Sequence, residues 1–135
     1  MNIKRLFSAF AAMAICLCAA AQEQLTPEQE RKEMMENIDK SVERMADALE
    51  LSDAQVFYLD SILVHDYNAM HEELLALNAA KVSNSDIYVQ ARDKWSERMY
   101  QSIRKILNDA QWAKYLKSGA GSEKKARDKR AAKRK

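Results

Sequence analysis

The stretch that decides the fold is residues 51–80, LSDAQVFYLDSILVHDYNAMHEELLALNAA. It holds neither proline nor glycine, the two residues that most often interrupt a helix. Its apolar side chains recur at alternating spacings of three and four, which places them on one face of a helix. The positions of this seam are Val56, Leu59, Leu63, Tyr67, Met70, Leu74 and Leu77. The pattern predicts one long helix over about residues 53–80.

This helix carries more apolar surface than a single packing face needs. At about 100° per residue, Phe57, Val64 and Leu75 fall well away from the seam, so the apolar stripe covers more than half of the circumference. A thin bundle of rods about 40 Å long cannot cover such a stripe completely. We therefore expect the surplus to meet a second subunit or a client protein. The alternative is a thicker intramolecular core that a short fourth helix closes.

Similar apolar seams flank this segment on both sides. They predict helices over about residues 27–50, 86–107 and, in shorter form, 109–117, with Ser83 or Ser85 capping the third long helix. No run of alternating β-branched residues indicates a sheet. The predicted fold is all-α, a thin bundle of three long helices plus a short C-terminal helix.

A phrase of the form Leu-x-x-x-Gln occurs three times, at residues 25–29, 51–55 and 107–111. Its second residue is a good N-cap, and its glutamine stands where the side chain can reach back to the cap's backbone N–H. The residues in this arrangement are Thr26 with Gln29, Ser52 with Gln55, and Asn108 with Gln111. In the second and third copies, Leu51 and Leu107 can pack on an apolar residue of the first turn. The phrases therefore predict where three helices begin.

The N-terminus predicts an export signal. Lys4 and Arg5 precede an apolar run over residues 6–21 that ends in three alanines, so we expect cleavage after Ala21 and a periplasmic mature protein. The run falls short of the roughly 20 residues that cross a bilayer, so a membrane helix is a weaker alternative, as is lipidation of a cysteine. Both cysteines lie within this run, so we expect neither a disulfide nor a thiol nucleophile in the mature chain.

The composition changes sharply after Ser118, which divides the mature chain into a helical domain, residues 22–118, and a basic tail, residues 119–135. From Ala120 on, eight Lys or Arg accompany two acids, a formal charge of +6, whereas residues 22–119 carry 12 Lys or Arg and 18 Asp or Glu, a charge of −6. So polar a segment buries too little apolar area to order itself, which predicts disorder.

Three roles fit such a tail. It can serve solubility, it can be attracted to the acidic body within one chain or between two, or it can contact an anionic surface such as lipid head groups. Nucleic acid would also suit the charge, but an exported protein is not expected to meet it.

The sequence offers no constellation for catalysis. Its two histidines lie six positions apart, and it has no glycine-rich phosphate loop, so we expect neither an enzyme nor a bound cofactor. His65 and Glu72 share one helix face, but a zinc site needs at least three protein ligands. A metal-responsive sensor would therefore need a second subunit to complete its site, and it is the less favoured alternative.

Side chains on or beside the apolar seams are the candidates for binding a client. Methionine in particular adapts to irregular partners. The candidates are Met34, Phe57, Val64, Met70, His71 and Arg92. Arg92 could offer a cation to an acidic client, although an arginine in such a stripe more often lays its stem on apolar neighbours with its head in water.

The phrases at residues 51–55 and 107–111, separated by a long helix and a polar break, resemble the twice-used Leu-Thr-x-x-Gln (LTxxQ) motif of the Spy/CpxP-like periplasmic proteins. Ser52 and Asn108 replace the threonine and keep its capping role. The resemblance covers about residues 49–117. It implies an elongated, cradle-like homodimer that acts as an ATP-independent chaperone or modulates an envelope-stress sensor.

These observations predict a periplasmic protein that binds unfolded or misfolded proteins through weak apolar contacts and limits their aggregation. The alternative is a regulatory adaptor that docks on the periplasmic domain of a sensor protein and releases it under stress.

Overall fold

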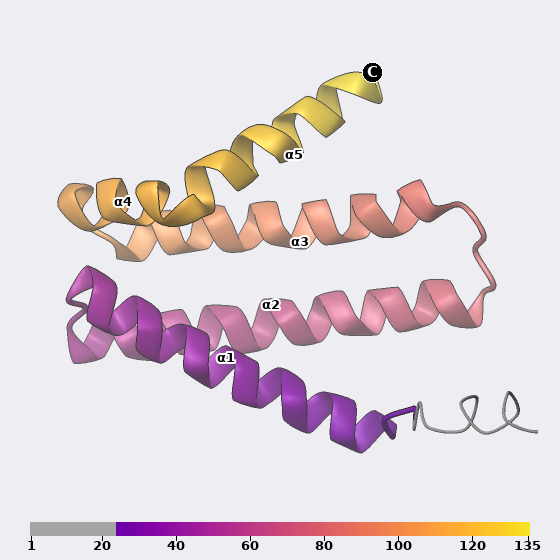
Figure 1. Cartoon of the computed structure of the whole chain (residues 1–135), viewed down its shortest axis with the longest axis horizontal. Helices are drawn as coiled ribbons and strands as arrows, with labels where there is room; N and C mark the ends of the chain where they lie inside the picture. Colours follow the sequence, from indigo (N-terminus) through magenta and orange to yellow (C-terminus); the bar gives the residue numbers. More distant parts are fainter. Residues whose placement is uncertain (1–23) are drawn as a thin grey trace, which may run out of the picture. The chain divides into compact units, whose positions relative to one another are not determined.

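The structure is a computed structural model that describes residues 24–135, and these residues form helices and no strand (Figure 1). Their order is α1 (Pro27–Leu49), α2 (Asp53–Ala79), α3 (Ser85–Ile106), α4 (Asp109–Tyr115), the π-helical turn η2 (Leu116–Ala120) and α5 (Gly121–Lys133). The prediction of an all-α chain with three long helices and a short C-terminal one is confirmed. The predicted signal, residues 1–21, lies outside the described residues. Within residues 24–135, no helix combines the length with the apolarity that crossing a bilayer requires.

The chain divides into two compact units after Glu33, and the packing described below is that of Met34–Lys135. Its centre is a cluster of buried aliphatic and methionine side chains from α1, α2, α3 and the residue after α3. The members are Ile38, Val42, Leu49, Leu59, Leu63, Met99, Ile103 and Leu107. Burying one such side chain fully stabilises the fold by about 1.5–3 kcal/mol. The seam positions Met70, Leu74 and Leu77 lie beyond this cluster and stay partly exposed.

Helices α2 and α3 form an antiparallel hairpin and lie side by side (Figure 1). The loop between them turns with Lys81 in a left-handed backbone conformation (φ 54°). The N-cap of α3 is Asn84, whose side chain accepts a hydrogen bond from the backbone N–H of Asp86 at 3.0 Å. The prediction of Ser83 or Ser85 as this cap is therefore wrong, because the asparagine between them reaches the first turn.

All three Leu-x-x-x-Gln phrases start a helix with a reciprocal capping box. At α2, the Gln55 backbone N–H donates to the Ser52 hydroxyl at 3.3 Å, and the Ser52 N–H donates to Gln55 Oε1 at 3.0 Å. At α4, Asn108 and Gln111 make the same pair of bonds at 2.8 and 3.0 Å. The predicted caps are thus confirmed, and each is worth about 1 kcal/mol.

The second and third phrases also meet each other in space. Gln55 Nε2 donates to Gln111 Oε1 at 2.7 Å and to the Ile106 carbonyl at 2.8 Å, while Gln111 Nε2 donates back to Gln55 Oε1 at 3.1 Å. Gln111 is buried, and every polar atom of this amide pair has a partner. The two glutamines therefore join the start of α2 to the start of α4, 56 residues further along the chain.

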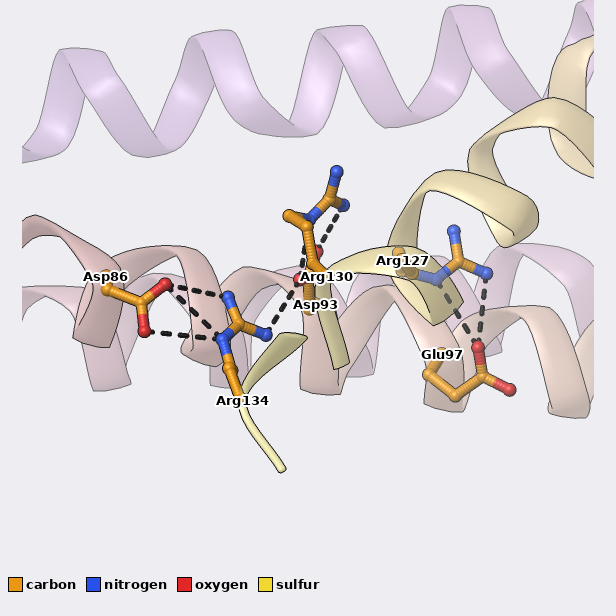
Figure 2. A network of polar contacts seen from close by, with 6 residues as sticks. All are labelled: Asp86, Asp93, Glu97, Arg127, Arg130 and Arg134. Carbon is orange, nitrogen blue, oxygen red and sulfur yellow. Dashed lines mark hydrogen bonds and ion pairs between the residues drawn. The ribbon is translucent and has the colours of Figure 1, made fainter. Parts of the chain in front are cut away.

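The basic tail is not disordered, and this prediction is wrong: Gly121–Lys133 form helix α5. The chain enters α5 through Gly119, whose positive φ of 116° a residue with a side chain rarely adopts. Figure 2 shows what orders the tail: Arg127, Arg130 and Arg134 reach carboxylates on α3. Composition predicted disorder from missing apolar area, but the acidic face of α3 stabilises the segment through ion pairs instead. The expected attraction between body and tail is thus present within one chain.

Candidate binding surface

The surplus apolar surface predicted for residues 53–80 is present on α2. Phe57 is 67 % exposed, Tyr58 56 % and Leu75 49 %, large values for apolar side chains in the middle of a helix. The rings of Phe57 and Tyr58 meet edge to face, with centroids 5.7 Å apart and planes at 72°. This geometry is the favourable one for an aromatic pair. Two aromatic rings therefore stand together in water on one side of the helix.

Several predicted contact residues continue this surface along α2. Val64, His71 and Leu75 follow Phe57 at steps of seven, seven and four, so they lie within about 40° of one line on the helix. We call Phe57, Tyr58, Val64, His71 and Leu75 the α2 outer face. Val64 also packs partly against the core, and His71 is half-exposed.

The remaining predicted contact residues lie elsewhere. Met34, on α1, is partly buried against the core cluster. Met70 is on α2 but roughly 140° around the helix from Phe57, on the side of the seam. Arg92 is exposed on α3. The structure therefore assembles three of the six predicted residues, Phe57, Val64 and His71, into one surface.

An acidic groove of about 490 Å³ runs beside Phe57 between α1 and α2. Its floor is apolar, and four carboxylates surround it. The lining residues are Asp39, Val42, Glu43, Asp53, Val56, Phe57 and Asp60. A partner that lays an apolar side chain on Phe57 would therefore place its flanking residues among negative charges, which favours partners rich in Lys and Arg.

On the Tyr58 side lies a smaller hollow of about 350 Å³ that ends at a buried carboxylate. Asp66 is 3 % exposed, and its carboxylate lies 3.2 Å from Arg98 Nε on α3 and 2.7 Å from His65 Nδ1. A buried carboxylate without such partners would be costly. Asp66 was missed in the sequence analysis, although an aspartate at the edge of the apolar seam is a readable signal of a polar contact between helices.

A second polar contact lies further along the hairpin. Glu73 accepts hydrogen bonds from the Trp95 indole N–H at 2.6 Å and from Lys94. The bond from Lys94, then that from Trp95, lowers the pKa of Glu73 below its ordinary value. Together with Asp66 and Arg98, these contacts set the register of α2 against α3 and so fix which α2 residues face outward.

A larger hollow than these two, of about 670 Å³, opens between α1, the hairpin and the C-terminal helices. Its walls include Met45 and three tyrosines, Tyr67, Tyr100 and Tyr115. Burial, followed by the charge of Glu123, raises the pKa of Tyr115 to about 12, and burial also raises the pKa of Tyr67. These phenols therefore stay neutral at physiological pH. The hollow offers aromatic and thioether side chains of the kind that accept apolar groups, and charged residues also line it: Arg44, Lys114, Lys117, Glu123 and Arg127.

Within residues 24–135, no three His, Cys, Asp or Glu side chains converge in a way that could hold a metal ion. His65 and Glu72, the pair considered as ligands, both lie exposed on α2. The His65 imidazole contacts Asp66.

The chain matches no family model, and neither a curated protein nor a solved structure shows significant similarity to it.

Proposed function

We propose that this protein is a periplasmic, ATP-independent chaperone that binds non-native polypeptides on the α2 outer face and limits their aggregation. The observation that supports this most is the exposed pair Phe57 and Tyr58, with Leu75 further along the same helix. Apolar side chains that cluster on the surface of a protein are a recognised mark of an interaction site. No part of the proposal requires a catalytic group.

The expected binding is weak and mobile. Burying one phenylalanine side chain gives about 1.5–3 kcal/mol, and association costs at least about 4 kcal/mol of lost freedom. A client held by two or three such contacts therefore dissociates readily. Because the contacts are apolar and not directional, many different unfolded sequences can make them.

The flanking charge narrows the class of client. The acidic groove beside Phe57 favours non-native segments in which apolar residues alternate with Lys or Arg. The acidic charge beside this surface differs from the positive charge of the cradle in the Spy/CpxP-like proteins. The preference for basic clients therefore follows from the residues of this chain and not from the resemblance.

The test is the aggregation of an unrelated denatured protein, followed by light scattering, with the full chain at several-fold molar excess. The variant Phe57→Ser/Tyr58→Ser/Leu75→Ser removes the exposed apolar side chains of α2. The matched control is Leu25→Ser, which also removes an exposed apolar side chain, 42 % exposed, but one that is not part of α2. We expect the wild type and Leu25→Ser to suppress aggregation and the triple variant to lose most of the effect. Equal suppression by all three would defeat the proposal.

A regulatory adaptor is the second candidate, because the acidic groove beside an exposed phenylalanine also suits one basic partner. A stable complex with a single sensor domain, together with indifference to unfolded proteins, would favour it over the chaperone.

A further inference from the structure

The cations of the C-terminal segment fall into two groups. Arg127 and Arg130 of α5, and Arg134 directly after it, contact α3, as Figure 2 shows. Arg130 makes two bonds to Asp93, at 2.6 and 2.8 Å. Arg134 reaches Asp86 at 2.9 Å, and Arg127 reaches Glu97 at 3.3 Å. The planar fork of arginine suits such paired bonds to carboxylates, so this face of α5 is already used.

Three lysines of α5 form the second group, whereas the fourth, Lys124, pairs with Glu97 on α3 at 3.3 Å. Lys125, Lys129 and Lys133 are exposed and follow one another at steps of four residues. At about 100° per residue, their directions differ from those of the three arginines by roughly 60–180°. The row is about 12 Å long, because each step of four residues rises about 6 Å. We call these three residues the lysine stripe.

The charge of the lysine stripe is not balanced on its own helix. Of the two acids of α5, Asp128 pairs with Lys124 at 2.6 Å, and Glu123 lines the tyrosine-walled hollow. The arginines balance the carboxylates of α3, so these carboxylates do not offset the lysines. Lys135 follows the stripe at the end of the chain and is also exposed.

We propose that the lysine stripe is a docking surface for an anionic phospholipid membrane. Ammonium groups are compact, strongly hydrated charges that bind phosphate head groups without a shaped pocket. The stripe is a convex row that lines none of the hollows described above, so it would not enclose a small phosphate ion. A membrane is an extended charged surface, and it can contact all three lysines of the stripe together.

The ion pairs between the arginines and α3 keep the lysine stripe in a folded helix before it binds a membrane. A disordered basic tail would lose conformational freedom when it settles on a membrane, whereas α5 is already folded by its ion pairs to α3. The inference is independent of the proposed chaperone activity, because it uses α5 and not α2.

The experiment is co-sedimentation of the full chain with vesicles of phosphatidylcholine, with and without phosphatidylglycerol. The test variant is Lys125→Gln/Lys129→Gln/Lys133→Gln. The matched control is Lys40→Gln/Lys81→Gln/Lys105→Gln, which removes three exposed lysines outside α5 and gives the same net charge. All chains share residues 1–23, so any contribution of those residues cancels in the comparison.

We expect the wild type and the control to bind only the vesicles that contain phosphatidylglycerol, and less so as salt rises. The stripe variant should bind about a hundredfold more weakly, because each lysine near the surface contributes about 1 kcal/mol. The proposal is overturned if the wild type binds vesicles equally well with and without phosphatidylglycerol. It is also overturned if both triple variants lose binding equally, since net charge alone would then explain the binding. Displacement from vesicles by polyphosphate at equal charge would also overturn it in favour of a soluble polyanion.

Discussion

At the scale of single residues, Gln55 and Gln111 do more than start helices. Each closes its own capping box, and each also bonds to the other, so the starts of α2 and α4 are held together. The repeated phrase therefore also forms a tertiary contact. Two copies in one chain can pair, whereas a single copy can only cap.

We predict that Gln111→Ala lowers the free energy of unfolding by about 2–3 kcal/mol, because it removes a cap bond and leaves the Gln55 amide partly unpaired. The matched control is Gln29→Ala, which breaks the capping box of the first phrase, whose bonds join only residues 26 and 29. That change should cost about 1 kcal/mol or less. Urea unfolding followed by circular dichroism measures both. Equal costs would show that the paired amides add nothing beyond capping.

Asp66 gives a second prediction at this scale. Replacing Arg98 by Met leaves the buried Asp66 carboxylate with His65 Nδ1 as its remaining side-chain partner, so we expect a loss of about 1–3 kcal/mol in unfolding free energy. The double variant Asp66→Asn/Arg98→Met should recover part of that loss, because no buried charge then remains. Additive losses in the double-mutant cycle would mean that the two side chains are not coupled.

The capping bonds of these glutamines could be predicted from the sequence, but the tertiary contact between them could not. An N-cap and the glutamine three residues later are neighbours in any helix, so Ser52 with Gln55 and Asn108 with Gln111 were identified correctly. The contact between Gln55 and Gln111 depends on how the chain folds back over 56 positions, and spacing along the chain carries no such information.

At the scale of helices, α5 is the element that sequence reasoning misjudged. Its composition was judged only by apolar content, and the signal lay instead in two matching periodicities. Acids at 86, 93 and 97 and arginines at 127, 130 and 134 each recur at helical spacing, so each set lies on one face. Pairing such faces would have predicted an ordered tail.

The docking of α5 should depend on pH and salt. Hydrogen bonds from Arg130 lower the pKa of Asp93, and those from Arg134 lower that of Asp86. Burial alone would raise the pKa of Glu97, but its bonds to Gln101, Lys124 and Arg127 outweigh this and lower it. Carboxyls with a lowered pKa bind fewer protons in the docked state than in the undocked one. Their stabilisation is therefore full above the ordinary carboxyl pKa of about 4 and is lost as pH falls below it.

Hydrogen exchange of the α5 amides measures this docking. We expect slow exchange near neutral pH, and loss of protection, after correction for intrinsic exchange rates, below about pH 4. Molar salt should weaken protection at neutral pH as well. Arg130→Gln should reproduce the effect at neutral pH, whereas Lys129→Gln, on the lysine stripe, should not. If the protection of the α5 amides does not change with pH or salt, interactions other than ion pairs dock α5 on α3.

At the scale of the whole molecule, the proposed function depends on apolar surface that residues 34–135 leave uncovered. The long apolar seam of residues 53–80 correctly predicted this surplus, because a helix apolar over more than half of its circumference exceeds what one neighbour can bury. The seam did not predict which residues would remain outside. Val64 and Met34 are partly buried against the core, because the way α1 packs on α2 determines which apolar side chains are covered.

A homodimer is the other way to use the α2 outer face, and we propose it as the state of the free protein. Sedimentation equilibrium should then show a dimer whose association Phe57→Ser/Leu75→Ser weakens, because both substitutions remove apolar area from the interface. If the variant associates as strongly as the wild type, the α2 outer face is not the interface.

The most direct measurement places a photo-crosslinking amino acid at position 57 and, as a control, at position 25, and exposes each chain to one client in its native and denatured forms. The account predicts cross-links from position 57 to the denatured client, few to the native one, and few from position 25 to either. Cross-linking from position 57 that is absent, or equal for native and denatured client, would contradict it.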